Sequence, residues 1–125
     1  MKLCQVVLRC SLWVAAFAAF VYVGSYLSDA HTRATKAPAC EWNAVPSPNN
    51  APYLARFCYL DKETVLLRLY DAEGKALLAE RSLFELDRPR FHWESDALGY
   101  NDRKYDGGEI ALPPTLLERL RAKLP

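Results

Sequence analysis

The sequence has no excess of charge of either sign. Sixteen lysines and arginines are matched by fifteen aspartates and glutamates, which gives a net charge of +1 over 125 residues. From Cys40 onward, twelve basic and fourteen acidic residues leave a net charge of −2. A protein that binds nucleic acid needs a concentrated basic face. The balance of charge therefore argues against a nucleic-acid partner.

Motifs for catalysis and cofactor binding are also absent from the sequence. There is no GxSxG or SxxK nucleophile signature, no GxxxxGK[ST] loop around Gly107 and Gly108, and no CxxC pair for a metal. The acidic segment 102–109 lacks the regular alternation of an EF-hand calcium loop. We therefore identify no catalytic residue, no cofactor site and no set of metal ligands in the sequence.

One long stretch, by contrast, has no charge at all. Residues 10–27 (CSLWVAAFAAFVYVGSYL) are uncharged and mostly apolar. As a helix they would be about 27 Å long, close to the thickness of the hydrocarbon core of a bilayer. Lys2 and Arg9 precede the stretch, so the positive-inside rule places residues 1–9 in the cytoplasm and the rest of the chain across the membrane. We predict a single-pass transmembrane helix at 10–27.

A cleaved signal peptide is the main alternative for this stretch. The apolar part of a signal peptide is normally about 7–15 residues long and ends near a small-x-small site. Here the run is longer and carries bulky aromatic residues, and the best cleavage site, Ser28-Asp29-Ala30, is a poor match. We favour an uncleaved anchor, and a secreted chain that begins at His31 is the alternative. The segment 37–40 resembles the lipidation site of a lipoprotein only weakly.

Residues 28–52 are predicted to form a Pro-rich linker, because four prolines and an Asn-Asn pair interrupt any apolar periodicity. Cys40 in this linker and Cys58 beyond it would lie outside the cytoplasm, where a bacterial periplasm or a secretory lumen is oxidising. We predict a disulfide between them, which would close a loop of about 19 residues and contribute about 3 kcal/mol. Two separate buried thiols are the alternative.

Residues 53–125 are predicted to form one small β-rich domain, periplasmic in a bacterial host. A first strand is expected at residues 54–60 and a hairpin at residues 64–84. Asp71 and Gly74 have the spacing of a type I turn with a left-handed glycine, which places Asp71 opposite Lys75. In that register Val65 faces Arg81, and the two following pairs on the same face are Leu67–Ala79 and Leu69–Leu77.

This register sorts the hairpin into two faces, because side chains alternate with period two along a strand. The predicted core face consists of apolar residues, namely Val65, Leu67, Leu69, Leu77, Ala79 and Leu83. The opposite face is more polar and consists of Leu66, Arg68, Tyr70, Glu80 and Ser82, with Arg68 diagonal to Glu80.

A short strand at 90–93 is predicted to hold the candidate binding surface Phe91, His92 and Trp93. A histidine between two aromatic residues could line a groove. The simpler interpretation, which we favour, is a strand with two core aromatics and one outward histidine. A turn-rich passage is expected through residues 98–100, and a last short strand at 109–112.

The C-terminal residues are predicted to form an amphipathic helix after Pro113-Pro114. Thr115 and Glu118 have capping-box spacing. Four leucines form one stripe at helical spacing, and they are Leu116, Leu117, Leu120 and Leu124. We expect this stripe to dock on the sheet and close its core. Binding to a membrane surface is the alternative, because three basic residues lie among the leucines.

The arrangement of a basic start, an apolar span, a polar linker and the segments LLRLYDAEGKALLAERSLFEL, RFHWESD and GGEIALP resembles small exported or inner-membrane-anchored proteins of proteobacteria. That resemblance covers about half of the chain, namely the hairpin and the final strand. It implies a location in the bacterial envelope. It transfers no known activity and no catalytic or binding residue.

The sequence as a whole therefore predicts an α+β protein with one transmembrane helix, a small antiparallel sheet domain and a C-terminal helix. We expect it to be anchored in the inner membrane and to bind another envelope protein rather than to catalyse a reaction. An immunity-type protein against a periplasmic toxin is one specific version of this hypothesis. A small enzyme that uses His92, Asp102 and Asp106 is the alternative from another class.

Overall fold

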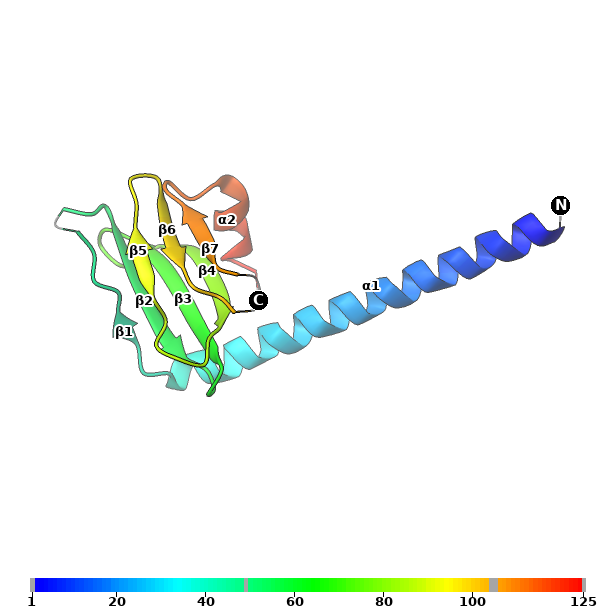
Figure 1. Cartoon of the computed structure of the whole chain (residues 1–125), viewed down its shortest axis with the longest axis horizontal. Coiled ribbons are helices and arrows are strands. Elements are labelled where there is room, and N and C mark those ends of the chain that lie inside the picture. The colour runs from blue at the N-terminus through cyan, green and yellow to red at the C-terminus, as the bar shows by residue number, and fades with distance from the viewer. Residues whose placement is uncertain (1, 49, 104–105, 125) are drawn as a thin grey trace.

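The computed structural model describes residues 2–48, 50–103 and 106–124. Its elements in chain order are α1 (Lys2–Lys36), the 3₁₀ turn η1 (Ala37–Ala39), β1 (Asn43–Ala44), β2 (Tyr53–Tyr59), β3 (Thr64–Asp71), β4 (Leu77–Phe84), β5 (Phe91–Trp93), β6 (Ala97–Tyr100), β7 (Gly108–Ala111) and α2 (Leu116–Arg121). The predicted α+β class is confirmed, since a long apolar helix precedes two small antiparallel sheets and a short terminal helix (Figure 1).

Helix α1 extends well beyond the predicted span. We had expected the helix to end at Leu27 and residues 28–52 to form a linker. Instead the helix continues without a break to Lys36, and η1 and β1 follow it. Ala30 in α1 and Ala37 in η1 are buried, so the end of the helix and the turn after it pack against the domain. This packing accounts for the continuation of the helix past the end of the apolar run.

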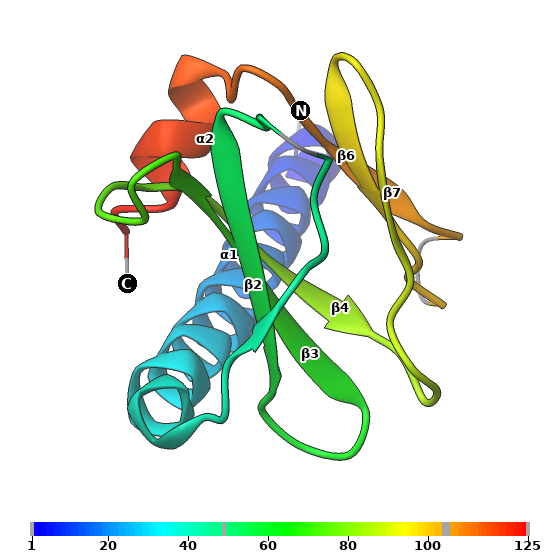
Figure 2. The same cartoon turned by 90° about the vertical axis from the view of Figure 1, so that its left-hand side faces the viewer.

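The two sheets have the strand orders β1-β2-β3-β4 and β5-β6-β7, and all neighbouring strands are antiparallel. They face each other across one apolar core (Figure 2). The first sheet and its β1–β2 connection contribute Val45, Ala55, Val65, Leu67, Leu69, Ala79 and Leu83. The second sheet contributes Leu98, Tyr100 and Ile110.

A second, smaller core covers the opposite face of the first sheet. Cys58 and Leu66 are fully buried there, and Ala37 of η1 packs against them. The predicted disulfide between Cys40 and Cys58 is present. It fastens the segment after α1 to β2. Strand β3 is therefore covered on both faces, which explains why consecutive residues of this strand are buried.

The β3–β4 hairpin differs in register from the prediction. Val65 pairs with Leu83 and Leu67 with Arg81, so the strands are shifted by two residues from the expected pairs. A shift of two preserves the face of each side chain. Five of the six side chains that we assigned to the core face are indeed in the core, namely Val65, Leu67, Leu69, Ala79 and Leu83.

A bulge and a longer turn cause this shift. The register changes between Leu69 and Tyr70, and the backbone N–H of Asp71 donates to the carbonyl of Ala76 over 3.1 Å. Gly74 has a φ of 72°, as the turn chemistry predicted. Leu77, which we expected on the core face, pairs with Tyr70 beyond the bulge and is not part of the core between the sheets.

Strand β6 was not predicted. Residues 98–100 were expected to be turns, but Ala97–Tyr100 form the central strand of the second sheet, and all four residues are buried. Gly99 lies opposite His92, whose imidazole lies so close that a Cβ at Gly99 would fall 2.0 Å from its Nε2 atom. The glycine that made this segment look like a turn thus leaves the space over which the exposed His92 side chain of the neighbouring strand lies.

Helix α2 begins as predicted, but it does not pack as predicted. The hydroxyl of Thr115 accepts a hydrogen bond from the backbone N–H of Glu118 over 3.3 Å and caps the helix. The leucine stripe, however, faces outward, and no residue of α2 is buried. The expectation that these leucines close the core is therefore wrong. An ion pair between Glu118 and Arg81 of β4 holds the helix to the sheet instead.

Candidate functional site

The predicted binding surface Phe91, His92 and Trp93 lies on β5, at an edge of the second sheet. Phe91 and Trp93 are half-buried and pack against the core. The ring centroid of Phe91 lies 5.2 Å from that of Phe57, and the indole N–H of Trp93 donates to the carbonyl of Pro46 over 2.8 Å. The favoured interpretation of two core aromatics is therefore confirmed.

Two hollows are lined by these aromatic side chains. The larger has a volume of about 520 Å³, and Phe57, Tyr59 and Phe91 are among its lining residues. The smaller has a volume of about 330 Å³, and its lining includes Trp93 and Leu112. Each half-buried aromatic of the predicted surface thus lines one hollow, Phe91 the larger and Trp93 the smaller. We call the two hollows together the aromatic surface.

His92 points away from the core, as the favoured interpretation required. Its side chain is mostly exposed, lies over Gly99 and is 3.6 Å from a carboxylate oxygen of Glu94. It does not line either hollow of the aromatic surface. The structure therefore separates the histidine from the two aromatics with which the sequence grouped it.

Asp102 and Asp106, the acidic residues of the enzyme hypothesis, line a different hollow of about 380 Å³. In that hollow, the buried carboxylate of Glu85 accepts a hydrogen bond from Arg103 over 3.0 Å, and Arg103 also pairs with Asp87 at 2.7 Å. These bonds hold the β4–β5 connection against the segment after β6. His92 is not among the lining residues. Within the described residues, no group of three or more histidines, cysteines or acids could hold a metal ion.

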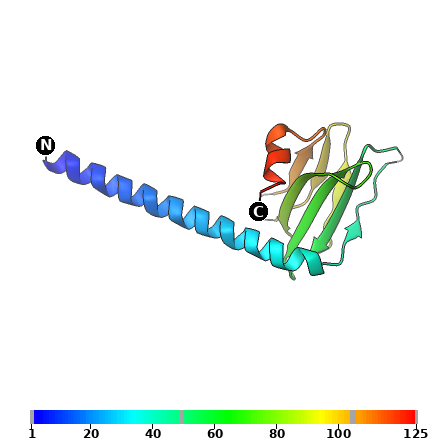
Figure 3. The same ribbon diagram turned by 180° about the vertical axis from the view of Figure 1, so that it is seen from behind.

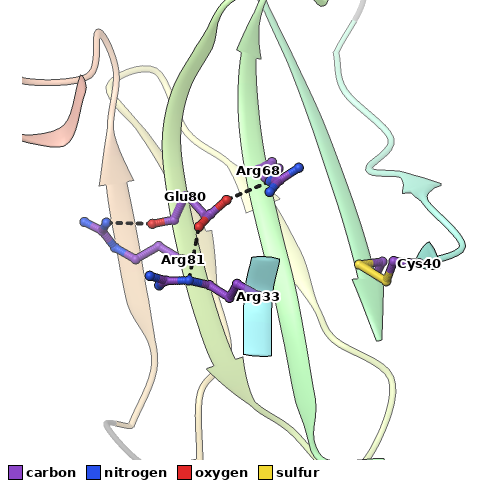
Figure 4. Close-up of polar contacts among 6 residues, drawn as sticks. Arg33, Cys40, Arg68, Glu80 and Arg81 are labelled. Carbon is purple, nitrogen blue, oxygen red and sulfur yellow. Dashed lines mark hydrogen bonds and ion pairs between the residues drawn. A yellow bond between two sulfur atoms is a disulfide. The ribbon is translucent and has the colours of Figure 1, made fainter. Parts of the chain in front are cut away.

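A third site joins the helical anchor to the sheet. Arg33 of α1 and Arg68 of β3 both reach Glu80 of β4, at 3.5 Å and 2.7 Å (Figure 4). The guanidinium of Arg68 also lies 4.9 Å from the ring centroid of Trp42. We call Arg33, Arg68, Glu80 and Trp42 the junction cluster. It borders a hollow of about 330 Å³ that α1, the outer face of the sheet and the C-terminal segment share.

The electrostatics of the junction cluster favour a fixed geometry. Partial burial alone would lower the pKa of Arg68, but the hydrogen bond and the negative charge of Glu80 raise it above its ordinary value. The side chain of Glu80 is only 14% exposed and serves two guanidinium groups. A carboxylate that pairs with two guanidinium groups forms strong charge-assisted interactions. The cluster is suited to fixing the angle between α1 and the domain.

Sequence reasoning missed the junction because it placed Arg33 in a linker. It did place Arg68 and Glu80 as neighbours on the outer face of the hairpin, and they are directly opposed in the structure. A signal for the third partner was present, since the small residues Ala30, Ala34 and Ala37 recur at helical spacing around Arg33. Such spacing indicates a helix face that packs closely against another element.

In comparisons with known proteins, no family model matches the chain, and neither a curated protein sequence nor a solved structure matches it. Among the described residues, one helix is long and apolar enough to cross a membrane, with a mean hydropathy of 2.0 over its most apolar window. None of that window is buried inside the domain. A signal sequence can have the same properties, so the helix is a candidate for either role.

Proposed function

We propose that this protein is a single-pass membrane protein that holds a small binding domain at the outer surface of the membrane, in the periplasm if the host is a bacterium. The observation that carries this proposal is the continuity of α1. The helix runs from the unburied apolar stretch directly into the contacts of Ala30 and Arg33 with the domain. Cleavage after Ala30 would cut the helix within this contact, so the packing supports an anchor that is retained.

Two further observations support the proposed orientation. Lys2 and Arg9 precede the apolar stretch, which favours a cytoplasmic amino terminus. The Cys40–Cys58 disulfide is consistent with a domain in an oxidising compartment. Together they support a domain on the side of the membrane opposite to the amino terminus.

The domain acts, in this proposal, by binding a protein segment at the aromatic surface. Aromatic side chains are typical of the centre of protein interfaces because they bury a large area at a small cost in conformational entropy. Tyr59 is 45% exposed at one of the two hollows. Anchoring would raise the effective concentration of the domain for a partner in the same membrane.

Topology is tested first. We would fuse to Pro125 a reporter that is active only in the cytosol or, in a parallel strain, one that is active only outside it. We expect activity from the second fusion alone. Mass spectrometry of the purified chain should find residues 1–30 still attached. A cytosolic signal, or a mature chain that starts at His31, would contradict the proposal.

Binding is tested with a photo-crosslinking residue at Tyr59, and at Lys75 on the exposed β3–β4 turn as the matched control. We expect a discrete cross-linked product from position 59 in intact cells and none from position 75. The same products from both positions, or none from position 59, would argue against a binding role for the aromatic surface.

A further inference from the structure

The outward face of α2 is the most apolar exposed surface of the domain. Leu117 is 75% exposed and Leu120 is 53% exposed, and Leu116 and Leu124 extend the same stripe. Water-exposed leucines of this density on one short helix are unusual for a soluble surface. A contiguous apolar stripe of this kind marks a contact site for a protein or a membrane.

The position of the C-terminal segment indicates which neighbour this is. Ala122 and Leu124 line the same hollow as Ala30 and Arg33 of α1. Ala30 lies only three residues beyond the end of the apolar stretch at Leu27, a rise of about 5 Å along the helix. Helix α2 lies on the side of the domain from which α1 leads away toward its amino terminus, in both opposite views (Figures 1 and 3).

The charges around the stripe are those that a lipid surface favours. The carboxylate of Glu118 is paired with Arg81 and is thereby directed toward the sheet. Arg119, Arg121 and Lys123 remain beside the leucines, and they are the only charged residues from 119 to 124. Leucines flanked by basic residues are the composition of helices that lie in the interface of anionic membranes.

We infer that α2 is a second membrane contact, which lies on the outer surface of the bilayer that α1 crosses. The leucine stripe enters the boundary between headgroups and acyl chains, and the basic residues meet lipid phosphates. This inference rests on the membrane-anchor part of the proposed function. With α1 fixed to the sheet by the junction cluster, the second contact fixes the orientation of the domain above the membrane.

A second copy of the chain is a poorer occupant for this face. Stable interfaces between proteins bury about 800 Å² on each partner. Helix α2 has only six residues, and its apolar face is bordered by like charges that would repel a symmetric partner.

The test uses the full chain in vesicles of phosphatidylcholine and phosphatidylglycerol. Cys4 and Cys10 are replaced by serine, so that a single new cysteine can carry an environment-sensitive fluorophore. The probe is placed in α2 by Leu120→Cys, and in the β4–β5 connection by Leu86→Cys, which is matched in exposure at 52%. A third position, Ala18→Cys, reports whether α1 is inserted. Nitroxide lipids with shallow and deep labels quench the fluorophore according to its depth.

We expect the deep nitroxide to quench the probe at position 18. The shallow nitroxide should quench the probe at position 120 at least about twofold more than the probe at position 86. Quenching at position 120 should be weaker in vesicles of phosphatidylcholine alone, because these lack anionic lipid. If position 18 is quenched but position 120 behaves like position 86, the inference is overturned and the anchor stands. Shielding of position 120 from water without quenching by lipid also overturns it, since a protein then covers the stripe. An unquenched probe at position 18 would contradict both the proposal that α1 is a membrane anchor and the inference about α2.

Discussion

The leucines of β3 and those of α2 belong to the same small domain and lie in opposite environments. Leu66, Leu67 and Leu69 are completely buried, whereas every leucine of α2 is more than half exposed. Both sets show a regular apolar pattern in the sequence. A pattern of this kind identifies which side chains share a face, but the surrounding elements decide what covers that face.

The two regions are also attached by different interactions. Strand β3 is held by apolar packing on both sides, from the second sheet and from the segment fastened by the disulfide. Helix α2 is held to the sheet by a polar contact, the ion pair of Glu118 with Arg81 of β4, while the Thr115 cap stabilises the helix itself. Because polar contacts face the sheet, the leucines of α2 face outward.

The largest expected effect is the difference in stability between truncating a buried leucine of β3 and truncating an exposed leucine of α2. Leu67→Ala should lower the free energy of unfolding of the full chain in detergent by about 2–5 kcal/mol, because it leaves a cavity between the two sheets. Leu120→Ala should change it by less than about 0.5 kcal/mol. Denaturant titrations of both variants measure the difference. Equal losses would show that detergent-solubilised α2 packs on the sheet after all.

Reduction of the disulfide is expected to have the next largest effect. Opening Cys40–Cys58 frees a loop of about 19 residues in the unfolded chain and should cost about 3 kcal/mol. It also releases the cover of the outer face at Leu66, so hydrogen exchange should increase in β2 and β3 more than in the second sheet. Thermal unfolding with and without reductant measures the loss. Faster exchange that is confined to β5–β7 would contradict this assignment.

Disrupting the junction cluster is expected to lower the free energy of unfolding by less than reduction of the disulfide does. Glu80→Gln leaves Arg33 and Arg68 without their shared carboxylate, so we expect a loss of about 1–2 kcal/mol, less than for a fully buried pair. Glu73→Gln is the matched control, because Glu73 pairs with Lys75 in the open and should contribute little. Protease sensitivity at residues 28–36 should rise in the first variant only. The same sensitivity in both variants would mean that the cluster does not hold α1.

The sequence predicted those features that depend on local periodicity. The two faces of the hairpin, the glycine turn and the outward His92 follow from alternation or from a short turn motif, and the structure confirms them, apart from Leu77 on the core face. The disulfide was predicted instead from the side of the membrane on which Cys40 and Cys58 would lie, and it is present. A register error of two residues left these faces unchanged because of the same periodicity.

The features that were missed depend on contacts between distant segments. Strand β6 is only four residues long and contains Gly99, so its strand character comes from pairing with β5 and β7 on both sides. The end of α1 packs on the domain through the buried Ala30 and through the ion pair of Arg33 with Glu80, which lies 47 positions later in the chain. The outward orientation of the α2 leucines depends on the ion pair of Glu118 with Arg81. None of these partners is visible within a local window of sequence.

The smallest expected effect concerns an exposed acid in the β2–β3 turn, Asp61. The Oδ1 atom of Asp61 accepts hydrogen bonds from the backbone N–H groups of Glu63 and Thr64, over 2.9 Å and 2.8 Å. The bond from Glu63 is the largest cause of a pKa below the ordinary 3.8 for Asp61. A pKa that folding lowers adds stability that is fully present above the unfolded value and is lost as the pH falls through the folded value.

Asp61→Asn keeps an oxygen acceptor in this turn but removes the charge. We therefore expect wild type to be more stable than this variant near pH 6, by less than about 1 kcal/mol because the group is exposed. The advantage should disappear as the pH falls below about 4, where the carboxyl of Asp61 takes up a proton. Asp61→Ala, which has no acceptor, should stay less stable than wild type at every pH. Denaturant unfolding at pH 6 and pH 3 separates the two variants, and a constant gap between wild type and Asp61→Asn would exclude titration of Asp61 as the source of its stabilising effect.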